Sequence, residues 1–354
     1  MINRDNYHAA RAYLQYQAET MQRNELSIRA YWLHLKILLR WADEVDFDSA
    51  PTIRPVFPRH LSTITRIDRP AEKYTAQTVR RVCQLARSFF HWLLLHQTKR
   101  YANITPGWID TLQPGRLAAE PCKVHQAVAL EQVQKLISIE VAEEDVATKR
   151  DIAAAAFLFL SGMRATAFLT LPIECVDISA RTVMQYPTLG VKTKNNKAAV
   201  TRLLEVSDLL AVVQAWDAFV RSQLPLSANW YPVIEQSFGR QTLTERPSGQ
   251  FRNRDFGRRI QRLFKKVGLE PLTPHKFRHG HALYGLNLSR DMGDYKAVSM
   301  NLMHSDIGIT DSVYAVLSDQ EMQERIAHLG RNGTENATST IALIVAEVVK
   351  QMHK

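Results

Sequence analysis

Cysteine is scarce in this sequence, and apolar runs are short. Three widely spaced cysteines, an odd number, exclude a disulfide framework and a cysteine-rich metal site: Cys83, Cys122 and Cys175. The longest apolar stretch, Ala153 to Met163, is too short to span a bilayer. The N-terminal residues form no apolar signal segment. We therefore expect an intracellular, cytoplasmic protein that is not inserted in a membrane.

The sequence also lacks the motifs of the common cofactor sites. It contains no Walker-type phosphate loop, no H-E-x-x-H zinc motif and no paired cysteines. We therefore expect no metal, nucleotide or redox cofactor. With 45% apolar and 23% charged residues, the composition is that of a soluble globular protein, and 354 residues favour two domains.

Acidic residues are outnumbered by basic ones, and the net charge is +10. Residues 1–116 hold 17 Lys and Arg against 10 Asp and Glu, and residues 240–278 hold 11 against 3. A basic region is either a solvated face or a binding site for a polyanion. Five arginines of the first region are candidate contacts to phosphates: Arg66, Arg69, Arg80, Arg81 and Arg87.

Apolar residues recur at helical spacing in the first third of the chain. The pattern predicts helices that start near Asp5, cover 28–42 and cover 79–93, the last with Thr75 as its N-cap. Three prolines predict a break before the last of these helices: Pro51, Pro55 and Pro58. We expect a bundle of four or five helices in residues 1–115. Residues 116–128, with Pro, Gly and small side chains, then predict a linker.

Residues 129–330 combine helical and strand patterns. Helices are predicted over 130–139, 149–163, 207–224, 253–267, 274–286 and 319–329. Strand patterns over 182–186 and 199–204 flank a polar tip and predict a β-hairpin. Residues 331–354 predict a C-terminal helix with an apolar stripe: Ile341, Ile344, Val345, Val348 and Met352. The expected fold is mainly α with a small β-hairpin or sheet, comprising a helical domain, a mixed α/β domain and the C-terminal helix.

Five residues suited to phosphoryl transfer follow the linker. Arg164 lies in L-S-G-M-R, His275 and Arg278 lie in H-K-F-R, His304 lies in L-M-H-S-D, and Tyr314 lies in D-S-V-Y-A. Paired arginines hold the non-bridging oxygens of a phosphodiester, and histidines move protons. A tyrosine can attack the phosphorus and form a covalent intermediate. Together with the basic regions, this set predicts metal-independent attack on DNA.

The order and wording of these motifs resemble the tyrosine recombinases of the phage-integrase family. The matching stretches are F-L-S-G-M-R-A-T-A-F-L-T-L, L-T-P-H-K-F-R-H-G-H-A and L-M-H-S-D-I-G-I-T-D-S-V-Y-A. The resemblance implies that Tyr314 attacks the scissile phosphate and forms a 3′-phosphotyrosine. It also implies that Arg164 and Arg278 clamp the phosphate, while His275 and His304 orient it and handle protons.

The resemblance further implies a lysine general acid at the tip of the hairpin. Lys194 is the first choice and Lys192 the second, because the family carries its lysine at such a tip. His279 is implied as a supporting residue, whereas His281 is expected to have no chemical role. Tyr284 and Tyr295 are the nearest rivals of Tyr314, and neither follows a histidine in the same context.

Two departures from the family pattern stand out. The family usually has a carboxylate three residues after the first arginine, where this chain has Ala167. Tyr314 follows His304 by ten residues, whereas the family more often has nine. Asp177 matches a common structural acid of the family and does not replace the missing carboxylate.

The resemblance implies double-stranded DNA with inverted-repeat recombination sites as the partner. It implies a helical domain at 1–115 that closes on the DNA and a catalytic domain at 129–330. The C-terminal helix at 331–354 either folds back on its own catalytic domain or is exchanged between protomers. The assembly would be a homo-tetramer on synapsed DNA and a monomer or dimer in solution. Two alternatives stay open: a type IB topoisomerase, and a DNA-binding architectural or regulatory protein. The sequence leaves open whether the recombinase integrates, excises or resolves a mobile element.

Overall fold

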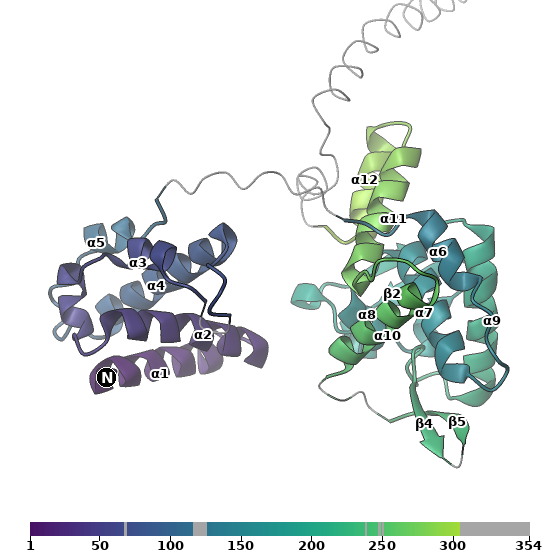
Figure 1. Cartoon of the computed structure of the whole chain (residues 1–354), viewed down its shortest axis with the longest axis horizontal. Helices are drawn as coiled ribbons and strands as arrows, with labels where there is room; N and C mark the ends of the chain where they lie inside the picture. The colour runs from purple at the N-terminus through teal and green to yellow at the C-terminus, as the bar shows by residue number, and fades with distance from the viewer. Residues whose placement is uncertain (67–68, 116–125, 238, 247–248, 250, 305–354) are drawn as a thin grey trace, which may run out of the picture. The chain divides into compact units, whose positions relative to one another are not determined.

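The chain forms two compact units, residues 1–123 and 124–354, in the computed structural model (Figure 1). The structure describes residues 1–66, 69–115, 126–237, 239–246, 249 and 251–304. Cys122, Tyr314, the helix expected at 319–329 and the segment 331–354 lie outside these residues. In the part that is described, no helix is long and apolar enough to cross a membrane.

The first unit is helical, as predicted. Its elements are α1 (Arg4–Glu19), α2 (Glu25–Ala42), η1 (Phe47–Thr52), α3 (Phe57–Thr63), α4 (Ala76–His96) and α5 (Pro106–Thr111). The predicted cap of α4 is confirmed, because the Thr75 side chain accepts a hydrogen bond from the Thr78 amide. The break predicted from the prolines is confirmed between α2 and α4, and it contains η1 and α3.

Aromatic side chains fill the core of the first unit. The Phe89 ring packs edge-on against Tyr13 at 5.3 Å and against Phe47 at 5.4 Å between centroids. All three side chains are buried, and they come from α4, α1 and η1. Such aromatic pairs add to the stabilisation from the area that they bury. Cys83 is also buried here, as a small core residue.

The second unit combines helices with two small antiparallel sheets. Its helices are α6 (Leu130–Ile137), α7 (Val146–Ser161), α8 (Ala165–Leu169), η2 (Ile173–Cys175), η3 (Pro187–Leu189), η4 (Lys194–Asn196), α9 (Ser207–Gln223), α10 (Arg252–Lys266), α11 (Pro274–Leu288) and α12 (Met292–Asn301). Its strands are β1 (Val176–Asp177), β2 (Thr182–Gln185), β3 (Ala199–Arg202), β4 (Val233–Ser237) and β5 (Arg240–Thr244). The predicted fold class and the predicted helices within the described residues are confirmed.

The predicted β-hairpin is confirmed as β2 and β3, which pair from Thr182 with Arg202 to Gln185 with Ala199. The two-residue strand β1 adds to β2 and makes a three-stranded sheet in the order β1-β2-β3. The separate β4–β5 hairpin and α12 were not predicted. In Figure 1 these two elements lie at opposite ends of the second unit.

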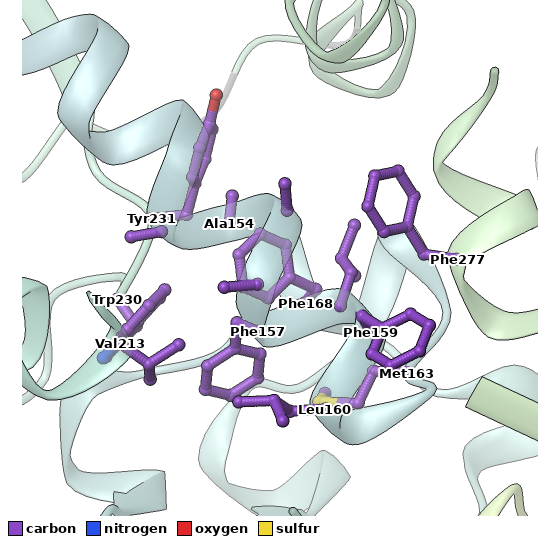
Figure 2. Close-up of a cluster of buried hydrophobic side chains, with 14 of the residues drawn as sticks. Ala154, Phe157, Phe159, Leu160, Met163, Phe168, Val213, Trp230, Tyr231 and Phe277 are labelled. Carbon is purple, nitrogen blue, oxygen red and sulfur yellow. The ribbon is translucent and has the colours of Figure 1, made fainter. Parts of the chain in front are cut away.

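Helix α7 is the centre of the second unit and is buried along nearly its whole length. Phe157 packs against Trp230 with ring centroids 4.6 Å apart, and Phe168 lies 5.3 Å from Phe157 (Figure 2). Because residues 152–160 of α7 are all apolar, this part of the helix has to be surrounded by other elements. Helices α6, α9, α10 and α11 all contact it. The C-terminal end of α7 is therefore held in place by the surrounding helices, and Arg164 lies three residues after Ser161, the last residue of α7.

Candidate active site

The end of α7 sets the position of Arg164. Gly162 has φ +60° and caps α7 in the left-handed conformation, its amide donating to the Leu158 carbonyl. A Cβ at Gly162 would lie 2.7 Å from carbon atoms of both His281 and Leu302. Only glycine fits this turn, for reasons of both conformation and space. Two residues later, half-buried Arg164 is the N-cap residue of α8.

Arg278 joins two chain segments that meet at this turn. It lies on α11, which starts with Pro274 in the first turn, and its side chain is buried. Its Nη1 donates to the Gly162 carbonyl at 2.7 Å, and its Nη2 donates to the Leu302 carbonyl. A guanidinium has five N–H groups in a planar fork, so Arg278 has a structural function besides any contact to substrate.

His304 is positioned by the C-terminal cap of α12. The His304 amide donates to the Ser299 carbonyl at 3.1 Å, and the Met303 amide donates to the Met300 carbonyl at 2.8 Å. This pair of bonds is a Schellman motif, in which the penultimate residue adopts the left-handed conformation. Met303 occupies that position with φ +53°. The motif turns the chain between Leu302 and His304. The Leu302 carbonyl accepts a hydrogen bond from Arg278.

The electrostatics of His304 reveal which groups surround it. The pKa of His304 is lowered from 6.5 to about 4, and burial is the largest cause. Three positive charges are the remaining causes: Arg278, Arg164 and Lys194. The imidazole is therefore neutral at pH 7, with one nitrogen as a donor and the other as an acceptor. Four of the residues predicted from the sequence thus come together.

The three histidines of α11 differ in their surroundings. His275 is exposed in the first turn, and its ring meets the His279 ring edge-on at 4.7 Å between centroids. His279 and His281 are buried. His281 Nδ1 lies 2.8 Å from the Phe159 carbonyl, and burial lowers its pKa from 6.5 to about 4. His281 therefore satisfies a carbonyl at the end of α7, in keeping with the expectation that it has no chemical role.

Lys194 lies in the turn between β2 and β3, and it begins the short helix η4. The turn is tied to the body of the unit because the Lys192 amide donates to Thr170 Oγ1 at 2.9 Å. Within the turn, Thr193 Oγ1 donates to the Lys197 carbonyl at 2.7 Å. Lys194 is the lysine whose charge acts on His304. The choice of Lys194 over Lys192 as the general acid stays a prediction.

The two departures from the family pattern have structural outcomes. Ala167 is buried in the apolar core of the second unit. An alanine side chain has no polar atom, so this position offers Arg164 no carboxylate. Asp177 Oδ1 accepts a hydrogen bond from the Ala180 amide at 2.8 Å and stabilises the turn after β1. Asp177 is therefore a structural acid and no substitute for a carboxylate at Ala167. The spacing between His304 and Tyr314 lies outside the described residues.

Several of the arginines predicted to contact phosphates form ion pairs within the first unit. Arg66 and Arg69 lie 3.4 Å and 3.3 Å from carboxylate oxygens of Glu72. Arg87 pairs with Asp110 at 2.6 Å. Arg81, on α4, lines a groove of about 530 Å³ together with His34 and Tyr31. Arg80 is exposed on the same helix. Contacts between any of these residues and a phosphate stay predictions.

Comparison with known proteins gives a consistent identification. The phage integrase family profile matches residues 126–321, more than half of the chain. Tyrosine recombinase XerC of Alcanivorax borkumensis is 27% identical over 252 residues, 71% of this chain and 72% of that protein. Tyrosine recombinase XerD of Proteus mirabilis is 24% identical over 304 residues, 84% of each chain.

Solved structures share the fold at low sequence identity. The Tn1549 transposon integrase in complex with circular intermediate DNA has a TM-score of 0.57 and 14% identity, covering 91% of this chain and 99% of that one. The XerH recombinase bound to difH has a TM-score of 0.57 and 16% identity, covering 90% and 83%. The family match, the relatives and the shared fold agree: the chain belongs to the phage integrase family and is a tyrosine recombinase.

Proposed function

We propose that this protein is a site-specific DNA recombinase that cleaves and rejoins strands through a 3′-phosphotyrosine. The observation that carries this proposal is the pair of Arg278 contacts, which join the turn before Arg164 to the chain just before His304. The charges of Arg278, Arg164 and Lys194 all help to lower the pKa of His304. Three cations near one uncharged imidazole form a site for an oxyanion. The scissile phosphate of DNA carries such a charge, and more negative charge develops on its oxygens as a nucleophile attacks.

Each residue has a distinct function in the proposed reaction. Arg164 and Arg278 would donate hydrogen bonds to the non-bridging oxygens. His304 would donate an N–H to the same phosphate, and His275 would assist with His279 behind it. Tyr314 would attack the phosphorus while His275 takes its phenolic proton, and the tyrosine oxygen would replace the 5′-oxygen of the next nucleotide. Lys194 would protonate that departing oxygen.

Rejoining is the reverse of cleavage. The 5′-hydroxyl of a partner strand would attack the phosphotyrosine and return its proton to Lys194, and Tyr314 would leave and regain its own proton from His275. Since the phosphotyrosine conserves the energy of the phosphodiester bond, rejoining needs no ATP. The charge that a metal would supply comes in this proposal from Arg164, Arg278 and Lys194.

The proposed partner is double-stranded DNA with inverted-repeat sites. The Tn1549 integrase and XerH structures are complexes with DNA, and the basic excess of this chain suits the same partner. Residues 1–115 would close on the duplex, 116–128 would be the linker, and 129–330 would carry the chemistry. Residues 331–354 would link protomers in a tetramer on synapsed DNA. Work on a DNA element implies a location in the cytoplasm, at the nucleoid.

A cleavage assay tests the phosphate clamp. The substrate is a duplex site selected by this protein from a random-sequence DNA pool, and cleavage is measured in a single turnover. Arg164→Ala should lower the cleavage rate about 10²–10³-fold, as loss of an oxyanion donor does. DNA affinity should change little, because it is spread over many phosphate contacts. Arg181→Ala is the matched control, because Arg181 pairs with Glu205 at 2.5 Å. Equal losses of binding and cleavage would make Arg164 a binding residue only.

A second substrate isolates the general acid. Lys194→Ala should impair cleavage of the ordinary phosphodiester, whereas a 5′-phosphorothiolate should restore it, because a thiolate leaves without protonation. Lys192→Ala is the matched comparison from the same turn and should behave like wild type on both substrates. Rescue of Lys192→Ala in place of Lys194→Ala would move the role by two residues.

A further inference from the structure

Asn301 makes a two-point contact with the edge of the β-sheet. It is the last residue of α12 and precedes His304 by three positions. Its Oδ1 accepts from the Arg202 amide at 2.7 Å, and its Nδ2 donates to the Arg202 carbonyl at 3.0 Å. The side-chain amide thus pairs with Arg202 as a residue of a neighbouring antiparallel strand would.

The geometry of β3 explains why these backbone groups are available. Strand β3 is the edge of the three-stranded sheet. The Leu203 amide donates to the Arg181 carbonyl at 2.9 Å, on the side of β2. Because the backbone groups of successive strand residues point in opposite directions, the amide and carbonyl of Arg202 face away from β2. Asn301 satisfies both, and so α12 is fastened to an edge that would otherwise be open.

A second hydrogen bond fixes the orientation of the same amide. Since the Phe159 carbonyl can only accept, His281 donates to it from Nδ1, and its Nε2 is left as an acceptor. Asn301 Nδ2 lies 3.3 Å from that Nε2 and donates its other hydrogen there. The lowered pKa of His281 keeps the ring neutral at pH 7, so this acceptor persists. Asn301 therefore connects β3, α11 and the end of α7.

Backbone contacts on either side of Asn301 extend the connection. The buried Gln185 donates to Thr201 Oγ1 at 2.6 Å, which in turn lies 3.4 Å from the Asn301 carbonyl. One residue later, the Leu302 carbonyl accepts from Arg278. The hairpin that carries Lys194 and the cap that carries His304 thus meet at Asn301, through its side-chain amide and its carbonyl.

We propose that Asn301 is a positioning residue, which holds His304 at a fixed place relative to Arg278 and to the Lys194 hairpin. This inference rests on the proposed function, in which those three groups act on one phosphate. Without the amide, β2 and β3 stay in their sheet, whereas the end of α12 keeps only the 3.4 Å contact between Thr201 Oγ1 and the Asn301 carbonyl. His304 is then the group that shifts.

The first measurement does not depend on activity. In protein with ¹³C-labelled histidine and without DNA, NMR titration gives the pKa of each ring. Asn301→Ala should move the pKa of His304 from about 4 towards the ordinary 6.5, because the imidazole leaves its buried place beside three cations. Asn287→Ala, an exposed asparagine of α11, is the matched control and should leave it unchanged. An unchanged His304 titration in Asn301→Ala would overturn the proposal, whether or not the protein cleaves DNA.

The second measurement uses the selected DNA site. Asn301→Ala should bind it as wild type does and cleave it at least tenfold more slowly. A 5′-phosphorothiolate should rescue Lys194→Ala and leave Asn301→Ala slow, because the defect lies at His304 and not at the general acid. Rescue of Asn301→Ala, or a wild-type rate, would refute the assignment. If Asn301→Ala does not fold, Asn301→Ser keeps a small polar side chain too short to span to Arg202, and the same outcomes apply. If the wild-type protein does not cleave DNA, but the pKa of His304 shifts in Asn301→Ala, the proposed function is refuted and the positioning role of Asn301 stands.

Discussion

Arg278 illustrates how structure and chemistry overlap at single residues of this site. Its guanidinium donates to the carbonyls of Gly162 and Leu302, so truncation would leave two buried acceptors without their donor. Loss of activity in Arg278→Ala would therefore combine a structural and a chemical defect. Arg164 is half-buried at the start of α8, and its substitution is the cleaner probe of the phosphate clamp.

Two histidines predict how stability depends on pH. The pKa of His281 and that of His304 are both lowered from 6.5 to about 4, so the unfolded chain binds protons that the folded chain excludes. Stability is complete above pH 6.5 and falls progressively towards pH 4. Fully buried His281 alone accounts for roughly 3 kcal/mol of this loss. Urea unfolding at a series of pH values checks the slope, and histidine NMR identifies the rings. Equal stability at pH 7 and pH 4.5 would contradict the assignment.

At the scale of elements, the entry of the chain into the second unit depends on one glycine of α11. A Cβ at Gly280 would lie 1.9 Å from the Val128 carbonyl oxygen. The Val128 amide donates to the Lys276 carbonyl at 3.0 Å, so the two backbones run in direct contact. Sequence inspection did not single out Gly280, since an isolated glycine in a helical pattern has no signature of close backbone approach.

We predict opposite effects for alanine at two helical glycines. Gly280→Ala should destabilise the second unit by more than about 2 kcal/mol, because backbone must move to relieve the clash. Gly257→Ala in α10 should stabilise by about 0.5–1 kcal/mol, because its Cβ would meet nothing closer than Pro274 at 3.9 Å and alanine favours the helix. Denaturant unfolding of both variants measures the difference. A stabilised Gly280→Ala would show that the contact with Val128 gives way easily.

The elements that the sequence predicted are those with a strong local pattern. Helix α7 was expected over 149–163 and occupies Val146–Ser161, because Asp145 caps its start and Gly162 ends it in the left-handed conformation. Helix α12 was missed, since its apolar residues follow no helical stripe and only Ser299 is buried. Strand β1 was missed because its two residues are too short for a pattern. Tertiary contacts, which a single sequence does not display, define both.

The same distinction applies to the site. Arg164, Arg278, His304 and Lys194 were predicted from motifs, and the electrostatics of His304 bring them together. Asn301 was not predicted, because a lone asparagine at a helix end looks like any other. Its importance comes from Arg202 and His281, which lie far from it in the sequence. Hydrogen-bond partners of this kind appear only in the folded chain.

At the scale of the whole molecule, we propose that residues 331–354, which lie outside the described residues, link protomers. Their apolar stripe holds five aliphatic side chains: Ile341, Ile344, Val345, Val348 and Met352. Burying each contributes about 1.5–3 kcal/mol before entropy costs are subtracted. Truncation after Gly333 should leave single-site DNA binding intact and sharply reduce paired-site complexes. Gel-shift assays with one and two sites separate the two effects. If the truncated protein is insoluble or unfolded, residues 331–354 belong to the core of their own protomer and do not link protomers.

We propose that Tyr314 forms a covalent bond with DNA at a site that includes Arg164, Arg278, Lys194 and His304. The most direct measurement uses a nicked substrate that releases its 5′-hydroxyl fragment on cleavage, so that rejoining is prevented. Wild-type protein should become attached to the 3′ end of the DNA, and peptide mapping of the adduct should identify Tyr314. Tyr314→Phe should bind the same DNA and give no adduct. An adduct at Tyr284 or Tyr295, or one that persists in Tyr314→Phe, would contradict the account.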